Sequence, residues 1–145
     1  SLTVVPFKTA GQGFSVAPLY MDFLIKFDAE TLTGYGLRFI RTTKYHDAVD
    51  CYFVKYENGK VSRVSEPVST SAFRPACDIT LEVKGNRLIA HAKTQEDHPR
   101  SSDGNVVAEM NMDADLTPSS LGGFGIEYAG GATVLIKNIR VEWEK

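Results

Sequence analysis

The chain has 145 residues, a formal net charge of −2, and a composition that is 43% hydrophobic and 23% charged. This length suits a single domain with a core of its own, and the composition is that of an ordinary globular protein. The near balance of 16 basic and 18 acidic residues argues against a nucleic-acid-binding protein, which needs clustered positive charge. No apolar run approaches the length that crosses a bilayer, so membrane insertion is not expected.

The cysteines and the first residues bear on the setting of such a domain. Cys51 falls within a predicted strand and Cys77 just before another. Two alternatives stay open for them: a pair of buried thiols, or a bridge if the protein is exported. The chain opens Ser-Leu-Thr-Val-Val without a Met, so we expect residues 1–145 to be one domain processed or excised from a longer protein.

Short segments that alternate apolar and polar residues run along the whole chain, which is the pattern of half-buried strands. The clearest alternations place the following side chains together on one face of each strand: Phe23, Ile25 and Phe27; Tyr35, Leu37 and Phe39; Ile79, Leu81 and Val83; Leu88, Ala90 and Ala92. Asn58-Gly59 predicts a type I′ turn, and 61–68 is expected to return from it as one short edge strand. About ten such strands without a helix predict a sandwich or barrel.

The last part of the chain, Leu121 to Lys145, is expected to be a closing hairpin. Its first strand alternates at Phe124, Ile126 and Tyr128, and Gly130-Gly131 suits a tight turn. Its second strand is expected to start at Val134 and to run to Trp143, with a bulge near Lys137-Asn138 that corrects the phase of the alternation. Because the first residues also look like a strand, we expect the two ends of the chain to pair.

The motifs Gly-Gly-Phe-Gly-Ile-Glu-Tyr and Val-Leu-Ile-Lys-Asn-Ile-Arg-Val-Glu in this closing part resemble the end of the concanavalin A-like β-sandwiches. More narrowly they resemble the laminin-G-like and glucanase-like modules of bacterial extracellular proteins that process polysaccharides. Glu-Val-Lys-Gly-Asn-Arg-Leu, at 82–88, is similar to a hairpin of the same modules. The resemblance implies an all-β fold of two antiparallel sheets, a jelly roll, and a setting that is secreted, periplasmic or on the cell surface.

A carbohydrate site needs aromatic rings that stack on sugars and planar polar groups that bind hydroxyls. The middle strands, which resemble the concave sheet of this family, offer such side chains on the face opposite Leu37 and Phe39. An ordinary solvated sheet face with cross-strand pairs is the alternative. The candidate carbohydrate-binding residues are Arg38, Tyr45, His46, Asp50, Tyr52 and Arg74.

Catalytic residues are not expected from the sequence. The glucanase-like enzymes of this fold class carry acidic residues that alternate on one strand, so that both carboxylates share a face. Glu109 and Asp113 are about 13 Å apart along a strand, and Glu142 and Glu144 lie at the chain end. An enzyme would therefore have to take its acids from separate strands.

A metal site or cofactor is not expected either. Many modules of this fold hold a structural calcium ion near an acidic residue that precedes the Asn-Ile-Arg-Val segment, and here that position is Lys137. Calcium requires oxygen ligands. The oxygen-rich loop 95–105 lacks the ordered spacing of a calcium loop.

These observations predict a non-catalytic carbohydrate-binding-type module that takes a polysaccharide or oligosaccharide. Two alternatives stay open. The first is a glycoside hydrolase of the same fold class, and the second is a structural domain that packs against a catalytic domain of a larger protein.

Overall fold

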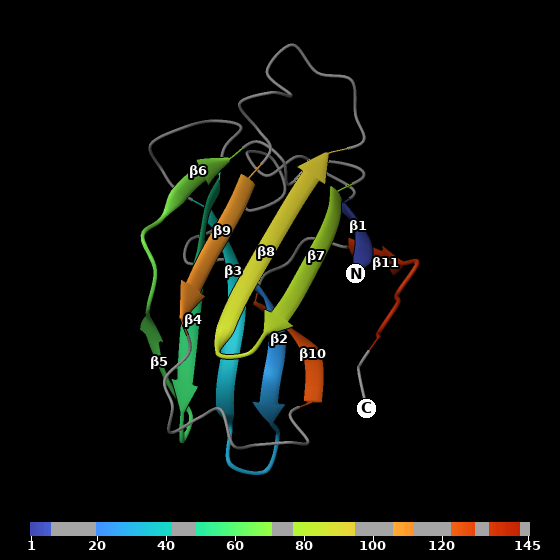
Figure 1. Cartoon of the computed structure of the whole chain (residues 1–145). Coiled ribbons are helices and arrows are strands. Elements are labelled where there is room, and N and C mark those ends of the chain that lie inside the picture. The colour runs from blue at the N-terminus through green and yellow to red at the C-terminus, as the bar shows by residue number, and fades with distance from the viewer. Residues whose placement is uncertain are drawn as a thin grey trace.

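The computed structural model describes residues 1–6, 20–41, 49–70, 77–94, 106–111, 123–129 and 134–142. Within these ranges the chain is all-β, and its strands form two antiparallel sheets that face each other (Figure 1). The β8 sheet has the order β11 (Val134–Lys137), β1 (Leu2–Pro6), β7 (Cys77–Lys84), β8 (Arg87–Thr94) and β9 (Val106–Asn111). The β3 sheet has the order β10 (Gly123–Ala129), β2 (Tyr20–Asp28), β3 (Thr33–Arg41), β4 (Val49–Glu57) and β5 (Lys60–Arg63), and β6 (Val68–Thr70) also pairs with β4. No helix of the described ranges is long and apolar enough to span a membrane.

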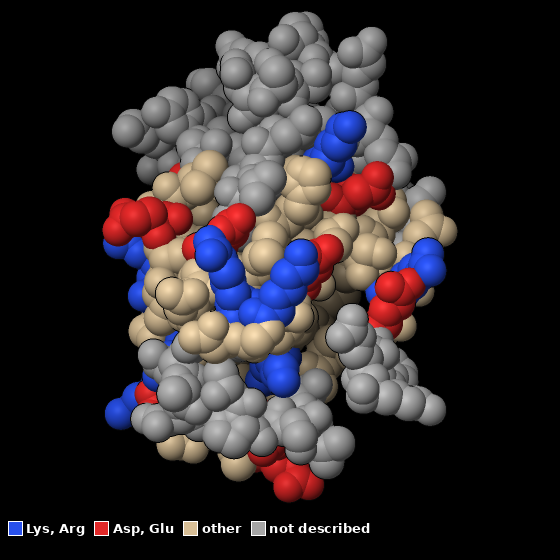
Figure 2. Space-filling model, viewed as in Figure 1, with Lys and Arg blue, Asp and Glu red and all other residues tan. Residues whose placement is uncertain are grey.

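The core lies between the two sheets and is built from the alternating residues that the sequence predicts. Phe23, Leu37 and Phe53 are direct cross-strand neighbours on β2, β3 and β4, and all are buried. Ile79 and Leu88 face them from the β8 sheet within the same apolar cluster. The outer face of the β8 sheet instead mixes acidic and basic side chains (Figure 2), with ion pairs such as Lys84–Glu82 at 3.6 Å. This is an ordinary solvated surface.

The two ends of the chain pair as predicted, but the prediction of a closing hairpin is wrong. β1 lies between β11 and β7, with Val4 opposite Ile136. β10 and β11 lie in different sheets, because β10 pairs with β2 while β11 pairs with β1. Alternation along a strand fixes which face is buried and leaves the partner strand open. The Gly130-Gly131 turn lies outside the described residues.

Two predicted strands end earlier than their alternation suggests. Segment 61–68 divides into β5 and β6 because its register against β4 shifts. Val64 N still donates to the Phe53 carbonyl at 2.9 Å, but the Phe53 N–H donates to Ser65 Oγ at 2.7 Å, and pairing resumes with Val68 opposite Cys51. Beyond β11, Asn138 has φ +57° at the predicted bulge, and 138–142 does not continue as a strand. Trp143 lies outside the described residues.

A bulge in β2 moves one predicted core residue to the other face. The pairing of β2 with β3 shifts between Ile25 and Asp28, where Lys26 has φ +53°. Phe23 and Ile25 pack into the core as predicted, whereas Phe27 packs against the cluster on the outer face of the β3 sheet. A single extra residue reverses the side of every later side chain. The prediction for Phe27 is therefore wrong, while the type I′ turn is confirmed by φ +51° at Asn58 and +83° at Gly59.

Cys51 and Cys77 are both buried in the core as free thiols, one from each sheet. Burial raises the pKa of Cys77 from its ordinary 9.0 to about 12, and burial, followed by the charge of Cys77, also raises the pKa of Cys51. The bridged alternative is thus not the state seen here.

These thiols predict a loss of stability in alkali. Above pH 9.0 the thiol of Cys77 ionises in the unfolded chain but stays protonated in the native one up to about pH 12, so stability falls as pH rises through this window. Urea unfolding at about pH 8 and about pH 10.5 measures the change. Cys77→Ala is expected to lower the free energy of unfolding at about pH 8 and to reduce its change between the two pH values. An unchanged difference between the two pH values would assign the effect to other groups.

Candidate functional site on the outer face of the β3 sheet

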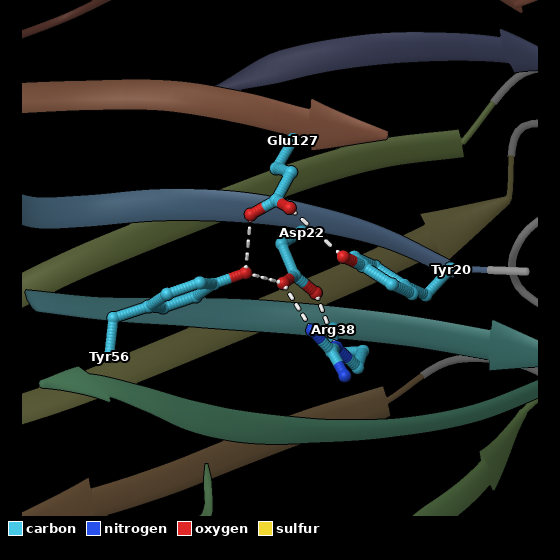
Figure 3. Close-up of polar contacts among 5 residues, drawn as sticks. All are labelled: Tyr20, Asp22, Arg38, Tyr56 and Glu127. Atoms are coloured by element: carbon cyan, nitrogen blue, oxygen red, sulfur yellow. Dashed lines mark hydrogen bonds and ion pairs between the residues drawn. The ribbon is translucent and has the colours of Figure 1, made fainter. Parts of the chain in front are cut away.

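One cross-strand row of four side chains organises the outer face of the β3 sheet. Glu127 of β10 lies opposite Asp22 of β2, Asp22 opposite Arg38 of β3, and Arg38 opposite Tyr52 of β4. Residues in direct register point to the same side of a sheet. Tyr20, one position earlier on that side of β2, and Tyr56, further along β4, extend toward this row (Figure 3).

Asp22 is the buried centre of the row. Its carboxylate has no exposed surface and accepts from Arg38 Nε at 2.7 Å and from Arg38 Nη2 at 2.8 Å. The Arg38 side chain is 13% exposed, and its guanidinium carbon stacks 3.8 Å from the centre of the Tyr20 ring. Burial acts to lower the pKa of Arg38, but the hydrogen bonds and charge of Asp22 outweigh it and raise that pKa. The pair is therefore a fixed, charged unit.

Tyr56 joins this unit to the edge strand β10. Its hydroxyl lies 2.7 Å from Glu127 Oε2 and is also hydrogen-bonded to Asp22. Because a phenol has one hydrogen, it serves one of the two carboxylates at a time. Burial, followed by the hydrogen bonds of Asp22 and Glu127, raises the pKa of Tyr56 above its ordinary 10.0. Tyr20 Oη donates to Glu127 Oε1 at 2.9 Å, so two phenols hold one exposed carboxylate.

Gly36 lies on β3, between its partners Leu24 of β2 and Val54 of β4, where this network crosses the sheet. Tyr56 starts opposite Gly34, yet its hydroxyl ends beside Asp22, so its ring crosses β3 (Figure 3). A Cβ on Gly36 would lie 3.1 Å from Leu24 Cδ2 and 3.3 Å from Val54 Cγ2, which is tighter than ordinary packing. Tyr56 packs with these two apolar side chains and meets the Phe27 ring edge-on at 5.3 Å between centres. The β2 bulge therefore helps to position Tyr56.

Removing the Tyr56 hydroxyl is expected to destabilise the protein. Tyr56→Phe keeps the ring but leaves the buried Asp22 with one donor fewer, and hydrogen bonds to charged groups contribute about 1.5–3 kcal/mol. Urea unfolding should show this loss as a lower midpoint with an unchanged slope. Tyr52→Phe is the matched control; a loss as large in that variant would mean that the Asp22 contact is not the cause.

The structure brings together three of the six residues that the sequence proposes. Arg38, Asp50 and Tyr52 share the outer face, with Asp50 opposite Ile40, and Arg63 lies 5.9 Å from the Tyr52 ring centre. The other three, Tyr45, His46 and Arg74, lie outside the described residues.

Sequence reasoning missed the two carboxylates, Asp22 and Glu127, and the phenol of Tyr20. Alternation with Phe23 does put Asp22 on the outer face. Nothing in the sequence, however, states that β10 pairs with β2, which is what brings Glu127 to it.

This arrangement has limited chemistry. The Tyr56 hydroxyl lies between the two carboxylates, hydrogen-bonded to Asp22 and 2.7 Å from Glu127 Oε2. Retaining glycosidases also use two neighbouring carboxylates, but Asp22 is buried and both of its oxygens are already bound. Among the described residues, no group of three or more His, Cys, Asp or Glu is placed to hold a metal ion.

Comparison of the chain with models of protein families, with curated proteins and with solved structures finds no match.

Proposed function

We propose that this chain is a non-catalytic carbohydrate-binding module with the jelly-roll arrangement of the concanavalin A-like sandwiches. The pairing of the terminal strands β1 and β11, and the passage of the chain from β10 in one sheet to β11 in the other, support this arrangement. The motif resemblance supports it too, and it gives the setting that we propose: an exported bacterial protein that acts on polysaccharides.

The observation that carries the proposal is the row Glu127–Asp22–Arg38–Tyr52 on one sheet face. With Tyr20 beside it, the row combines planar charged groups, phenol hydroxyls and half-buried aromatic rings, which is the chemistry that recognises a hydroxyl-rich ligand. The side-on pair with Asp22 holds Nε and Nη2 of Arg38 and so fixes the plane of its guanidinium group. A preorganised donor of this kind loses little entropy on binding.

A glycan array with the purified domain tests the proposal. Wild type is expected to bind at least one glycan, and Tyr52→Ala is expected to weaken binding by about tenfold through loss of a stacking ring. Arg38→Ala is unsuitable because it disturbs a buried pair. His91→Ala, on the exposed face of the β8 sheet, is the matched control and should bind like wild type. Absence of binding to every glycan would contradict the proposal.

A glycoside hydrolase is the second candidate, supported by the meeting of Asp22 and Glu127 at one phenol oxygen. It would need Asp22 to exchange its contacts with Arg38 and Tyr56 for a sugar carbon, which its burial opposes. Release of reducing sugar by wild type but not by Glu127→Gln would favour the enzyme over the module.

Packing against a catalytic domain is a further role of the same module. It is supported by large exposed apolar side chains near the end of the chain, of which Phe124 is 64% and Ile139 57% exposed.

A further inference from the structure

We propose that the outer-face site selects glycans that carry free, protonated amino groups, and that Glu127 is the residue that selects them. This rests on the proposed carbohydrate-binding function and adds a ligand class to it.

The positive charge of Arg38 is neutralised by Asp22. It faces Asp22, which is buried and bound through both oxygens, so this pair presents no net charge to a ligand. Glu127 differs because it lies on the edge strand and is exposed. Its described partners are two phenols, at 2.9 Å and 2.7 Å, and neither carries a compensating charge. Within the part of the chain that the structure describes, Glu127 is therefore a carboxylate without a positively charged partner.

Among the described residues, no lysine or arginine forms an ion pair with Glu127. Asp50 and Arg63 both belong to the far side, on β4 and β5, where Arg63 lies beside Tyr52. Strands β2 and β3 separate both of them from Glu127 on β10. Adjacent strands are about 4.8 Å apart, so more than one such spacing separates Glu127 from these two charges, and salt screens their interaction.

The free positions on Glu127 also suit an ammonium group. A carboxylate has about four acceptor sites, and each of its oxygens here meets one phenol, which leaves a site on each oxygen for a ligand. An ammonium offers three donors and a positive charge, so it matches both the remaining sites and the sign. A uronate or sulfate group would instead face like charge. A hydroxyl-rich neutral glycan would make the hydrogen bonds without the charge interaction.

Calorimetric titration at about pH 6 and low salt tests this with three probes: a chitosan oligosaccharide, its fully N-acetylated counterpart, and an oligogalacturonate. We expect the chitosan probe to bind about fivefold more tightly than the N-acetylated one, since one exposed ion pair contributes about this factor. Glu127→Gln keeps an acceptor for the phenols and should reduce that preference to about onefold. High salt should do the same in wild type. Glu82→Gln, which removes an exposed carboxylate from the β8 sheet, is the matched control and should keep the preference.

The outcomes separate this inference from the function on which it rests. If the N-acetylated or another neutral glycan binds as tightly as chitosan, the module remains and amine selection is overturned. If Glu127→Gln weakens both probes equally, Glu127 positions hydroxyl groups and amine selection is again overturned. Tighter binding of the oligogalacturonate would also overturn it. Failure of wild type to bind any probe or any arrayed glycan overturns both proposals.

Discussion

Arg38→Met is expected to lower the free energy of unfolding by about 3–5 kcal/mol, the largest loss predicted for this protein. The substitution leaves the carboxylate of Asp22 buried without its counter-ion, and removing one partner of a buried ion pair costs about this much. Urea unfolding at neutral pH measures it through the shift in midpoint at constant slope. A loss below about 1 kcal/mol would mean that Asp22 finds solvent or another donor when Arg38 is absent.

The double variant Asp22→Leu with Arg38→Met is the control for this prediction. It removes both charges and keeps apolar bulk at each position, and such replacements of buried pairs are often neutral or stabilising. We therefore expect it to recover most of the loss. A double variant that is less stable than Arg38→Met alone would show that the pair holds the fold by more than its charges.

Gly34→Ala is expected to cost about 2–4 kcal/mol, from backbone strain together with overpacking. Gly34 has φ +152°, and a Cβ there would lie 2.4 Å from the Lys26 carbonyl oxygen and 2.6 Å from Phe27 Cα. Both contacts are with main-chain atoms of the β2 bulge, so no side chain can move aside. Thermal and urea unfolding measure the loss.

Gly85→Ala provides a matched comparison for Gly34. It also has positive φ, +61°, but a Cβ there meets no atom within 4 Å. Its cost should be only that of the left-handed conformation, about 1 kcal/mol. Equal losses in the two variants would show that the close approach of β3 to the bulge is readily relaxed.

The sequence predicts most of the core but less of the connections. Residues such as Leu37 and Leu88 are found where period-two alternation puts them, because alternation directly reports which face is buried. It does not report where a strand acquires an extra residue, so Phe27 appears on the unexpected face. Nor does it name the partner strand, and for that reason β10 and β11 were expected to pair with each other.

The site shows the same division. Arg38, Asp50 and Tyr52 can be assigned to one face from their own strands, since their neighbours Phe39, Cys51 and Phe53 alternate with them. Glu127 comes from a strand about 100 residues further along, and only the pairing of β10 with β2 brings it to Asp22. Alternation with Tyr52 also assigns Tyr56 to this face, but its contact with Asp22 depends on the path that Gly36 and the β2 bulge leave for its ring across β3.

The buried position of Asp22 beneath exposed neighbours has a consequence for protein engineering. The parts that keep the face rigid, Asp22 and Tyr56, are not those that meet solvent most freely, Glu127 and Arg63. A library that varies only Glu127 and Arg63 therefore changes what the surface recognises and keeps the contacts of Asp22 with Arg38 and Tyr56. A binding reagent for a new ligand can be sought on this scaffold without destabilising the sheet.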